Sequence, residues 1–374
     1  MHNHHNFWLH LLPRKELTQV YASAALRSFA ISLVSLFIPL YLYIERGYSL
    51  QETLLFFLIY SVLFALFTPL AAKFSARYGV KHAVLISVPL YLVFIVLLYL
   101  LPQVNIPLSV IGFFLGMSLA FYWMGMNLVF RKASKQCSRG AEVGKNMSIS
   151  ILATMIGPLL GGLIIQNFGF KILFIISGLG LLGSAFFLFL SKEKHIPYNF
   201  SLKNIFANGN WSNALFFMSR GTYIMAEGVI WPLFIFAVLG SYASLGLMGM
   251  ILSGISALLL WKVGCYSDKI DRRKIIISMS IFESLGWFMR SVVDKVWHVF
   301  GITIFGAIVY GIREAPMEAL ELDKAQRDIA TYFVHREIFI CLGRILMILI
   351  VLIAGNLGAG LWFQGIATLA ALLF

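Results

Sequence analysis

Apolar residues occur in this chain in long uninterrupted runs, not in the short alternating patterns of a soluble protein. A helix needs about 20 apolar residues to cross the roughly 30 Å hydrocarbon core of a bilayer. Twelve runs of about this length follow one another, so the pattern predicts an all-α membrane protein with twelve transmembrane helices. The runs cover residues 17–44, 54–71, 83–101, 107–130, 146–166, 172–190, 211–239, 245–263, 275–293, 298–320, 332–354 and 357–374.

The longest polar stretch lies close to the middle of the chain, with six predicted helices on either side. It runs from Ser191 to Asn210 and carries lysines and several asparagines. We therefore predict an N-terminal six-helix half over residues 1–190, a cytoplasmic linker over 191–210 and a C-terminal six-helix half over 211–374.

The basic residues indicate how the chain is oriented. Of the 29 Lys and Arg, 20 lie in the N-terminal tail and the even-numbered loops, four in the odd-numbered loops and five inside predicted helices. Loops rich in Lys and Arg remain in the cytoplasm. We therefore predict a multi-pass protein of the cytoplasmic (inner) membrane with both termini in the cytoplasm.

Composition narrows the class of function. The chain is 60% hydrophobic and 12% charged, and its mean hydropathy is +0.87. Its net charge of +13 lies mostly in loops, which suits anionic lipid and gives no reason to expect nucleic acid. Three cysteines without a close-spaced pair indicate neither a disulfide framework nor a metal site. No P-loop or enzyme signature is found, so we predict no enzymatic activity and no cofactor.

A short, strongly charged loop is predicted between the runs that end at Val263 and begin at Ile275. It contains the pattern Gly-x-x-x-Asp-Lys-x-x-Arg-Arg, formed by Gly264, Asp268, Lys269, Arg272 and Arg273.

A second, less complete copy of this pattern starts 192 residues earlier, which is about half of the 374-residue chain. It keeps Arg77 and Gly79, but Ala76 stands where the first copy has its aspartate. Two such loops half a chain apart resemble the repeated signature of the major facilitator superfamily. The resemblance implies two six-helix halves that rock about a central site in alternating access.

The fifth predicted helix carries a second motif of that family. Gly157, Pro158, Gly161 and Gly162 form Gly-Pro-x-x-Gly-Gly, which resembles a signature of the family's antiporters. This favours a secondary transporter that exports a small solute by antiport. Small residues at close helix contacts explain the same pattern. A nutrient symporter, a uniporter, a lipid flippase, and a receptor or scaffold that does not transport remain alternatives.

Charged residues inside membrane helices are costly and therefore mark functional positions. Five lie in helices that line the central cavity in the resembled family, and we predict them as a substrate or proton site: Arg27, Arg220, Glu227, Glu314 and Glu318. The alternative is a set of structural ion pairs. Glu227 lies too far along its helix from Arg220 for easy contact, so we expect it to be free to meet Arg27, a substrate cation or a proton.

The resemblance also implies a contact between the charged loop and the eleventh helix. In the family the loop aspartate docks at the start of that helix in one conformation, which would bring Asp268 to Arg336. The predicted partners are thus a small-molecule substrate, with proton coupling left open, and membrane lipid. We predict a monomer.

Overall fold

The computed structural model describes residues 15–133, 139–190, 211–267, 271–324 and 329–373, and all of their regular elements are helices. The first set, called here the N-terminal helices, comprises α1 (Lys15–Ser35), α2 (Ile38–Leu40), the π-helical turn η3 (Tyr41–Glu45), α3 (Leu50–Tyr78), α4 (Val80–Leu100), α5 (Leu108–Ala133) and α6 (Arg139–Leu190). The second set, the C-terminal helices, comprises α7 (Trp211–Met225), the π-helical turn η6 (Ala226–Ile230), α8 (Trp231–Leu239), α9 (Tyr242–Ser267), α10 (Arg272–Arg290), α11 (Val296–Lys324), α12 (Ile329–Ala354), α13 (Leu357–Thr368) and the 3₁₀ turn η7 (Leu369–Leu373).

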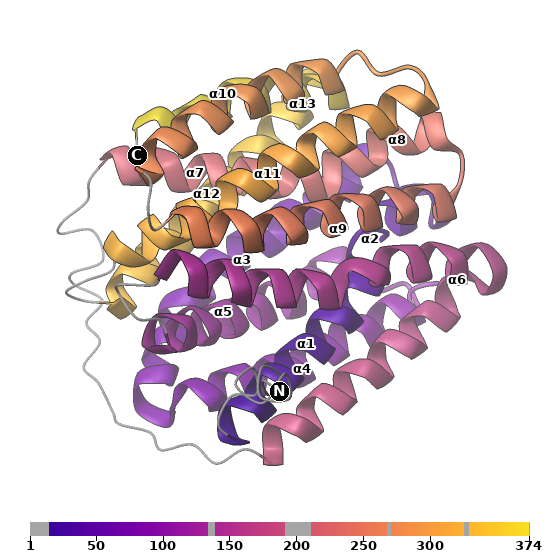
Figure 1. The fold of residues 1–374 in the computed structure, drawn as a ribbon. Coiled ribbons are helices and arrows are strands. Elements are labelled where there is room, and N and C mark those ends of the chain that lie inside the picture. Colours follow the sequence, from indigo (N-terminus) through magenta and orange to yellow (C-terminus); the bar gives the residue numbers. More distant parts are fainter. Residues whose placement is uncertain (1–14, 134–138, 191–210, 268–270, 325–328, 374) are drawn as a thin grey trace, which may run out of the picture.

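Nine helices within the described ranges are long and apolar enough to cross a membrane. One of them, α6, has 52 residues and would measure about 78 Å if it were straight. It is not straight, because Gly169 has φ 77° and the chain folds back there, as Figure 1 shows at the edge of the bundle. The apolar runs predict three further passes, at the return leg of α6, at the charged helix α10, and at α13 with η7. The count of twelve transmembrane helices stays a prediction.

The helices begin and end where local chemistry satisfies their free backbone groups. Ser49 and Glu52 form a capping box at the start of α3, and the Asp271 carboxylate accepts from the backbone N–H of Arg273 at the start of α10. Between α3 and α4 the connection is Gly79 alone, with φ 107°, a conformation that favours glycine. The less complete copy of the motif, around Arg77 and Gly79, is thus mostly helical, and the prediction of a loop there is wrong.

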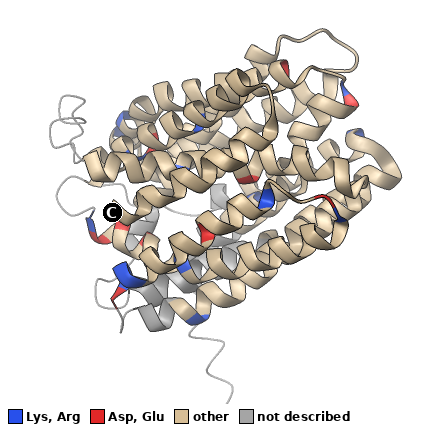
Figure 2. Ribbon diagram, turned by 90° about the horizontal axis from the view of Figure 1, so that it is seen from above, with Lys and Arg blue, Asp and Glu red and all other residues tan. Residues whose placement is uncertain are grey.

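Successive passes run in opposite directions, which gives the bundle two ends. We call the end where α1 and α7 begin the terminal face, and the end near Gly240 the opposite face. Figure 2 shows a ribbon that is mostly tan, with few charged residues along the middle of the helices. The predicted location of the terminal face in the cytoplasm stays a prediction.

Small residues let α6 lie close to α1 and α9, its most extensive neighbours. A Cβ on Gly157 or Gly161 would overlap α1, and a Cβ on Gly162 would overlap the Tyr242 carbonyl at the start of α9. Gly246 of α9 packs against the Pro158 carbonyl in the same way. The Gly-Pro motif therefore forms the contact between the N-terminal and C-terminal helices on this side of the bundle.

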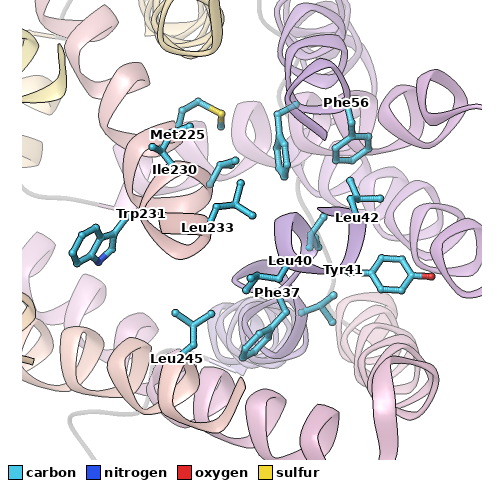
Figure 3. Packing of buried hydrophobic residues seen from close by; sticks show 14 of the residues in the cluster. Phe37, Leu40, Tyr41, Leu42, Phe56, Met225, Ile230, Trp231, Leu233 and Leu245 are labelled. Atoms are coloured by element: carbon cyan, nitrogen blue, oxygen red, sulfur yellow. The ribbon is translucent and has the colours of Figure 1, made fainter. Parts of the chain in front are cut away.

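Two apolar clusters join the N-terminal and C-terminal helices. Toward the opposite face, Phe37 and Leu40 pack with Ile230, Leu233 and Leu245, as Figure 3 shows. Near the terminal face lies a second cluster, called the terminal-face cluster, which includes Ala72, Val80, Leu322, Ala330 and Val334. The space between these two clusters holds the candidate site.

Candidate functional site

A cavity of about 450 Å³ lies midway along the bundle, and both sets of helices form its wall. Its lining is mainly apolar and aromatic, with hydroxyl groups at a few points. The lining side chains include Ser28 and Ser35 of α1, Tyr122 and Trp123 of α5, Glu227, Trp231, Ser253 of α9 and Thr303 of α11. Such a wall suits a small solute with an apolar body and a few polar groups.

Glu227 is the charged side chain among the described residues of the cavity wall. It lies in the π-helical turn η6, one turn before Pro232, whose missing N–H removes a helical hydrogen bond. π turns of this kind are frequent at functional sites.

The carboxylate of Glu227 is ion-paired with Arg290 of α10. The Arg290 guanidinium also stacks on two indole rings, 4.1 Å from the ring centre of Trp287 and 4.9 Å from that of Trp231. The expectation that Glu227 is free to meet Arg27 is therefore wrong. A side chain from a neighbouring helix supplies its cation.

Arg27 lies behind the cavity wall and not in it. It is 1% exposed, and none of its three guanidinium nitrogens has a hydrogen-bond partner. Its Cζ atom lies 3.6 Å from the ring centre of Tyr122 and 5.7 Å from that of Tyr91, so the rings stabilise the cation through their faces. Because Tyr122 lines the cavity, this ring separates Arg27 from the solute space.

The other three predicted site residues meet one another near the terminal face. Arg220 of α7 donates to Glu314 at 2.6 Å and to Glu318 at 3.0 Å, and it lies 3.3 Å from Glu321. The three glutamates stand four and then three residues apart on α11, so they share one face of that helix.

Arg336 of α12 extends this group. It contacts Glu321 at 2.6 Å, Glu337 at 2.8 Å and Glu318 at 3.2 Å. Glu337 also accepts from the Asn127 amide of α5 at 3.0 Å, which links the group to the N-terminal helices. We call these seven side chains the arginine–glutamate network: Asn127, Arg220, Glu314, Glu318, Glu321, Arg336 and Glu337.

Three further charged side chains are buried among the described residues. Glu283 of α10 is ion-paired with Arg313 of α11. Arg344 of α12 is buried, and its Cζ atom lies 4.9 Å from the ring centre of Phe64 on α3.

The charged-loop motif is only partly described. Gly264 lies in the last turns of α9, whereas Asp268 and Lys269 fall outside the described residues. Arg272 pairs with Asp323 at the end of α11 at 2.5 Å, and Arg77 stacks on Tyr78 at 5.3 Å. The predicted contact between Asp268 and Arg336 thus stays a prediction, and the Arg336 guanidinium is bound within the arginine–glutamate network.

Comparison with known proteins decides the family. The model of the Major Facilitator Superfamily matches residues 20–312 of this chain, more than half of its length. The chain belongs to the major facilitator superfamily.

This chain is similar in sequence to the uncharacterized protein YqgE of Bacillus subtilis (strain 168). It is 25% identical over 351 residues, which cover 87% of this chain and 79% of YqgE. Among solved structures, the human organic anion transporter MFSD10 (TETRAN) matches with a TM-score of 0.69 at 12% identity, over 96% of this chain and 99% of its own. The E. coli fucose:proton symporter FucP matches with a TM-score of 0.67 at 12% identity, over 95% and 96% of the two chains.

Membership of the major facilitator superfamily confirms the resemblance read from the charged-loop motif. The protein is an integral, multi-pass membrane protein of a family of secondary transporters. Its family therefore indicates that it is a transporter rather than an enzyme. The similar structures include a symporter, so the fold itself gives no preference for export.

Four residues of the interior were missed as site candidates from the sequence: Asn127, Arg290, Glu321 and Glu337. For Glu321 a signal exists, since it continues the one-sided spacing of Glu314 and Glu318. The others are recognised only when α5, α10 and α12 are placed beside their partners.

Proposed function

We propose that this protein transports a small amphipathic solute across the membrane by alternating access, with the cavity as its binding site. The observation that carries the proposal is the shared wall, to which both sets of helices contribute. An apolar cluster joins the two sets on either side of the cavity, so parting one cluster opens the cavity to one face. In this proposal Glu227, held by Arg290, contacts the solute, and Arg27 supports Tyr122 from behind.

The experiment uses cysteines in the cavity wall, one from each set of helices. Ser35→Cys on α1 and Ser253→Cys on α9 both line the cavity, and the three native cysteines are replaced first. A membrane-impermeant maleimide should alkylate each introduced thiol from either side of the membrane, in right-side-out and in inverted vesicles. Alkylation from one side only would contradict alternating access and favour a receptor or scaffold.

We further propose that the solute is exported in exchange for protons. The Gly-Pro motif of α6 supports this direction through its resemblance to the antiporter signature. Solutes that raise the melting temperature of the purified protein are then tested for flux into liposomes under a pH gradient. An antiporter accumulates the solute on the acidic side, whereas accumulation on the alkaline side would show a symporter.

A further inference from the structure

Arg27 is a buried cation without an anion. The structure gives its three guanidinium nitrogens no hydrogen-bond partner, and only the rings of Tyr91 and Tyr122 face the charge. The face of an aromatic ring attracts a cation, but it offers no oxygen acceptor to the five N–H groups of a guanidinium. Donors that are buried and unsatisfied in this way destabilise the state in which they occur.

Most interior arginines of this protein have a carboxylate partner. The four that are ion-paired with glutamates are Arg220, Arg290, Arg313 and Arg336. Arg27 and Arg344 instead lie against rings. A carboxylate is the group whose two oxygens match the donors of a guanidinium, and no carboxylate of the described residues contacts Arg27. The partner that Arg27 lacks can therefore come from outside the chain.

Arg27 lies at the end of the cavity that is nearer the terminal face. The α1 residues that line the cavity begin with Ser28, the next residue along the chain, and continue to Leu36. Tyr122 lines the cavity from α5, and its ring lies between the cavity and the guanidinium. Arg344, by contrast, is not among the described residues of the cavity wall. Movement of the Tyr122 ring is thus sufficient to bring Arg27 into contact with a solute.

The charge around the cavity decides which kind of solute fits. Glu227 is paired with Arg290, so this part of the wall is neutral, and Arg27 adds one positive charge without a counterion. A cationic solute would compete with Arg290 for Glu227 and would add a second unbalanced positive charge. A solute with one negative charge makes the site neutral and leaves the pair of Glu227 and Arg290 intact.

We propose that the solute is an amphipathic organic anion whose carboxylate displaces the Tyr122 ring and forms a bidentate pair with Arg27. The pair gives the guanidinium the oxygen acceptors that the ring cannot supply. Tyr122 moves by rotation about its Cα–Cβ bond to another staggered position. The apolar body of the solute lies along the aromatic wall, which includes Trp123 and Trp231. Calling the anion a solute rests on the transport function proposed above, but the anion site does not.

Calorimetry on the purified protein tests the charge of the ligand with three probes of similar shape. The probes are naphthalene carboxylate, the neutral naphthalene carboxamide, and naphthylmethylammonium. We expect the carboxylate to bind about tenfold more tightly than the carboxamide, because a hydrogen bond to a charged group contributes at least this factor. The ammonium probe should bind most weakly. Equal binding of the three probes, preference for the ammonium probe, or no binding of the carboxylate would overturn the proposal.

Arg27→Gln tests which residue recognises the charge. The affinity for the carboxylate should fall about tenfold, to that of the carboxamide, and the affinity for the carboxamide should not change. The matched control is Arg344→Gln, which also removes an interior arginine from the face of a ring but lies outside the described cavity wall. This control should keep the preference of the parent protein. A preference for the carboxylate that persists in Arg27→Gln would overturn the proposal.

Modification by phenylglyoxal tests the cover over Arg27 and leaves that residue unchanged. This reagent attacks accessible guanidinium groups, and mass spectrometry of the peptide that contains Arg27 reports the extent of reaction. We expect slow modification in the parent protein and in Tyr122→Phe, which keeps the ring, and faster modification in Tyr122→Ala. Naphthalene carboxylate should protect Arg27 in each protein. A rate that does not respond to Tyr122→Ala, or lack of protection by the carboxylate, would overturn the proposal.

Inorganic phosphate distinguishes an organic anion from a small inorganic one. It should bind more weakly than naphthalene carboxylate, because it has no apolar body to place against the aromatic wall. Equal or tighter binding of phosphate would assign Arg27 to an inorganic anion and overturn the proposal. All of these measurements are made without a membrane gradient. They can fail while Ser35→Cys and Ser253→Cys still react from both sides of the membrane, and the labelling can fail while the anion binds.

Discussion

At the scale of single residues, the interior of the bundle is organised by arginine. Six arginines lie in the interior of the described part of the chain, five of them buried and Arg220 partly exposed, and four of the six are ion-paired with glutamates on other helices. The other two, Arg27 and Arg344, lie against aromatic rings. The aromatic rings and the carboxylates stabilise these cations in the interior of the bundle, where the dielectric constant is low.

Loss of one partner should show which of these pairs hold the fold together. Glu227→Gln leaves Arg290 buried without its carboxylate, and removing one member of a buried pair costs about 3 kcal/mol. We expect a lower melting temperature than in the parent, with part of it restored in the double variant Glu227→Gln with Arg290→Gln. Glu45→Gln serves as the control. An unchanged melting temperature in Glu227→Gln would show that the pair contributes little to stability.

The sequence predicts the buried charges better than it predicts their partners. Spacing along one helix places Glu314 and Glu318 on a common face, and the structure has them there. Their cations come from two other helices. Arg220 of α7 lies 94 residues before Glu314, and Arg336 of α12 lies 18 residues after Glu318. No periodicity within a helix predicts such a contact, and this is why the pairing of Glu227 with Arg290 was not expected.

At the scale of helices, α6 and α9 meet through glycine. A Cβ on Gly246 would overlap the Pro158 carbonyl, a backbone atom that cannot move alone, whereas a Cβ on Gly178 would meet nothing within 4 Å. Gly246→Ala should therefore cost about 1–3 kcal/mol of stability. Gly178→Ala should leave stability unchanged or raise it, because alanine favours a helix. Melting temperatures of the two purified variants check this, and equal values would contradict the close contact.

The extent of each helix was largely predictable, because length and hydropathy are properties of the local sequence. The predicted and observed helices differ at the helix ends and at the bends within helices. The α3 helix continues to Tyr78, beyond the apolar run, since a polar helix end at the membrane surface costs little. The π-helical turn that carries Glu227 was not foreseen, because the apolar pattern continues through it.

At the scale of the whole molecule, the orientation in the membrane is still a prediction. The imbalance of 20 to four basic residues places the 191–210 stretch in the cytoplasm. A cysteine at Ser201 in that stretch should resist an impermeant maleimide added to intact cells and react after the membrane is opened. Efficient labelling of intact cells would reverse the assignment.

The two ion pairs of α10 also constrain how the nascent chain is built into the bilayer. Arg290 finds its partner on η6, which is synthesised earlier, but Glu283 must wait for Arg313 of α11. Each unpaired charge at the centre of a bilayer costs about 2.5–3.5 kcal/mol during insertion. We therefore expect α10 to be retained at the translocon until the ribosome has delivered α11, so that the two enter the lipid together as one hairpin.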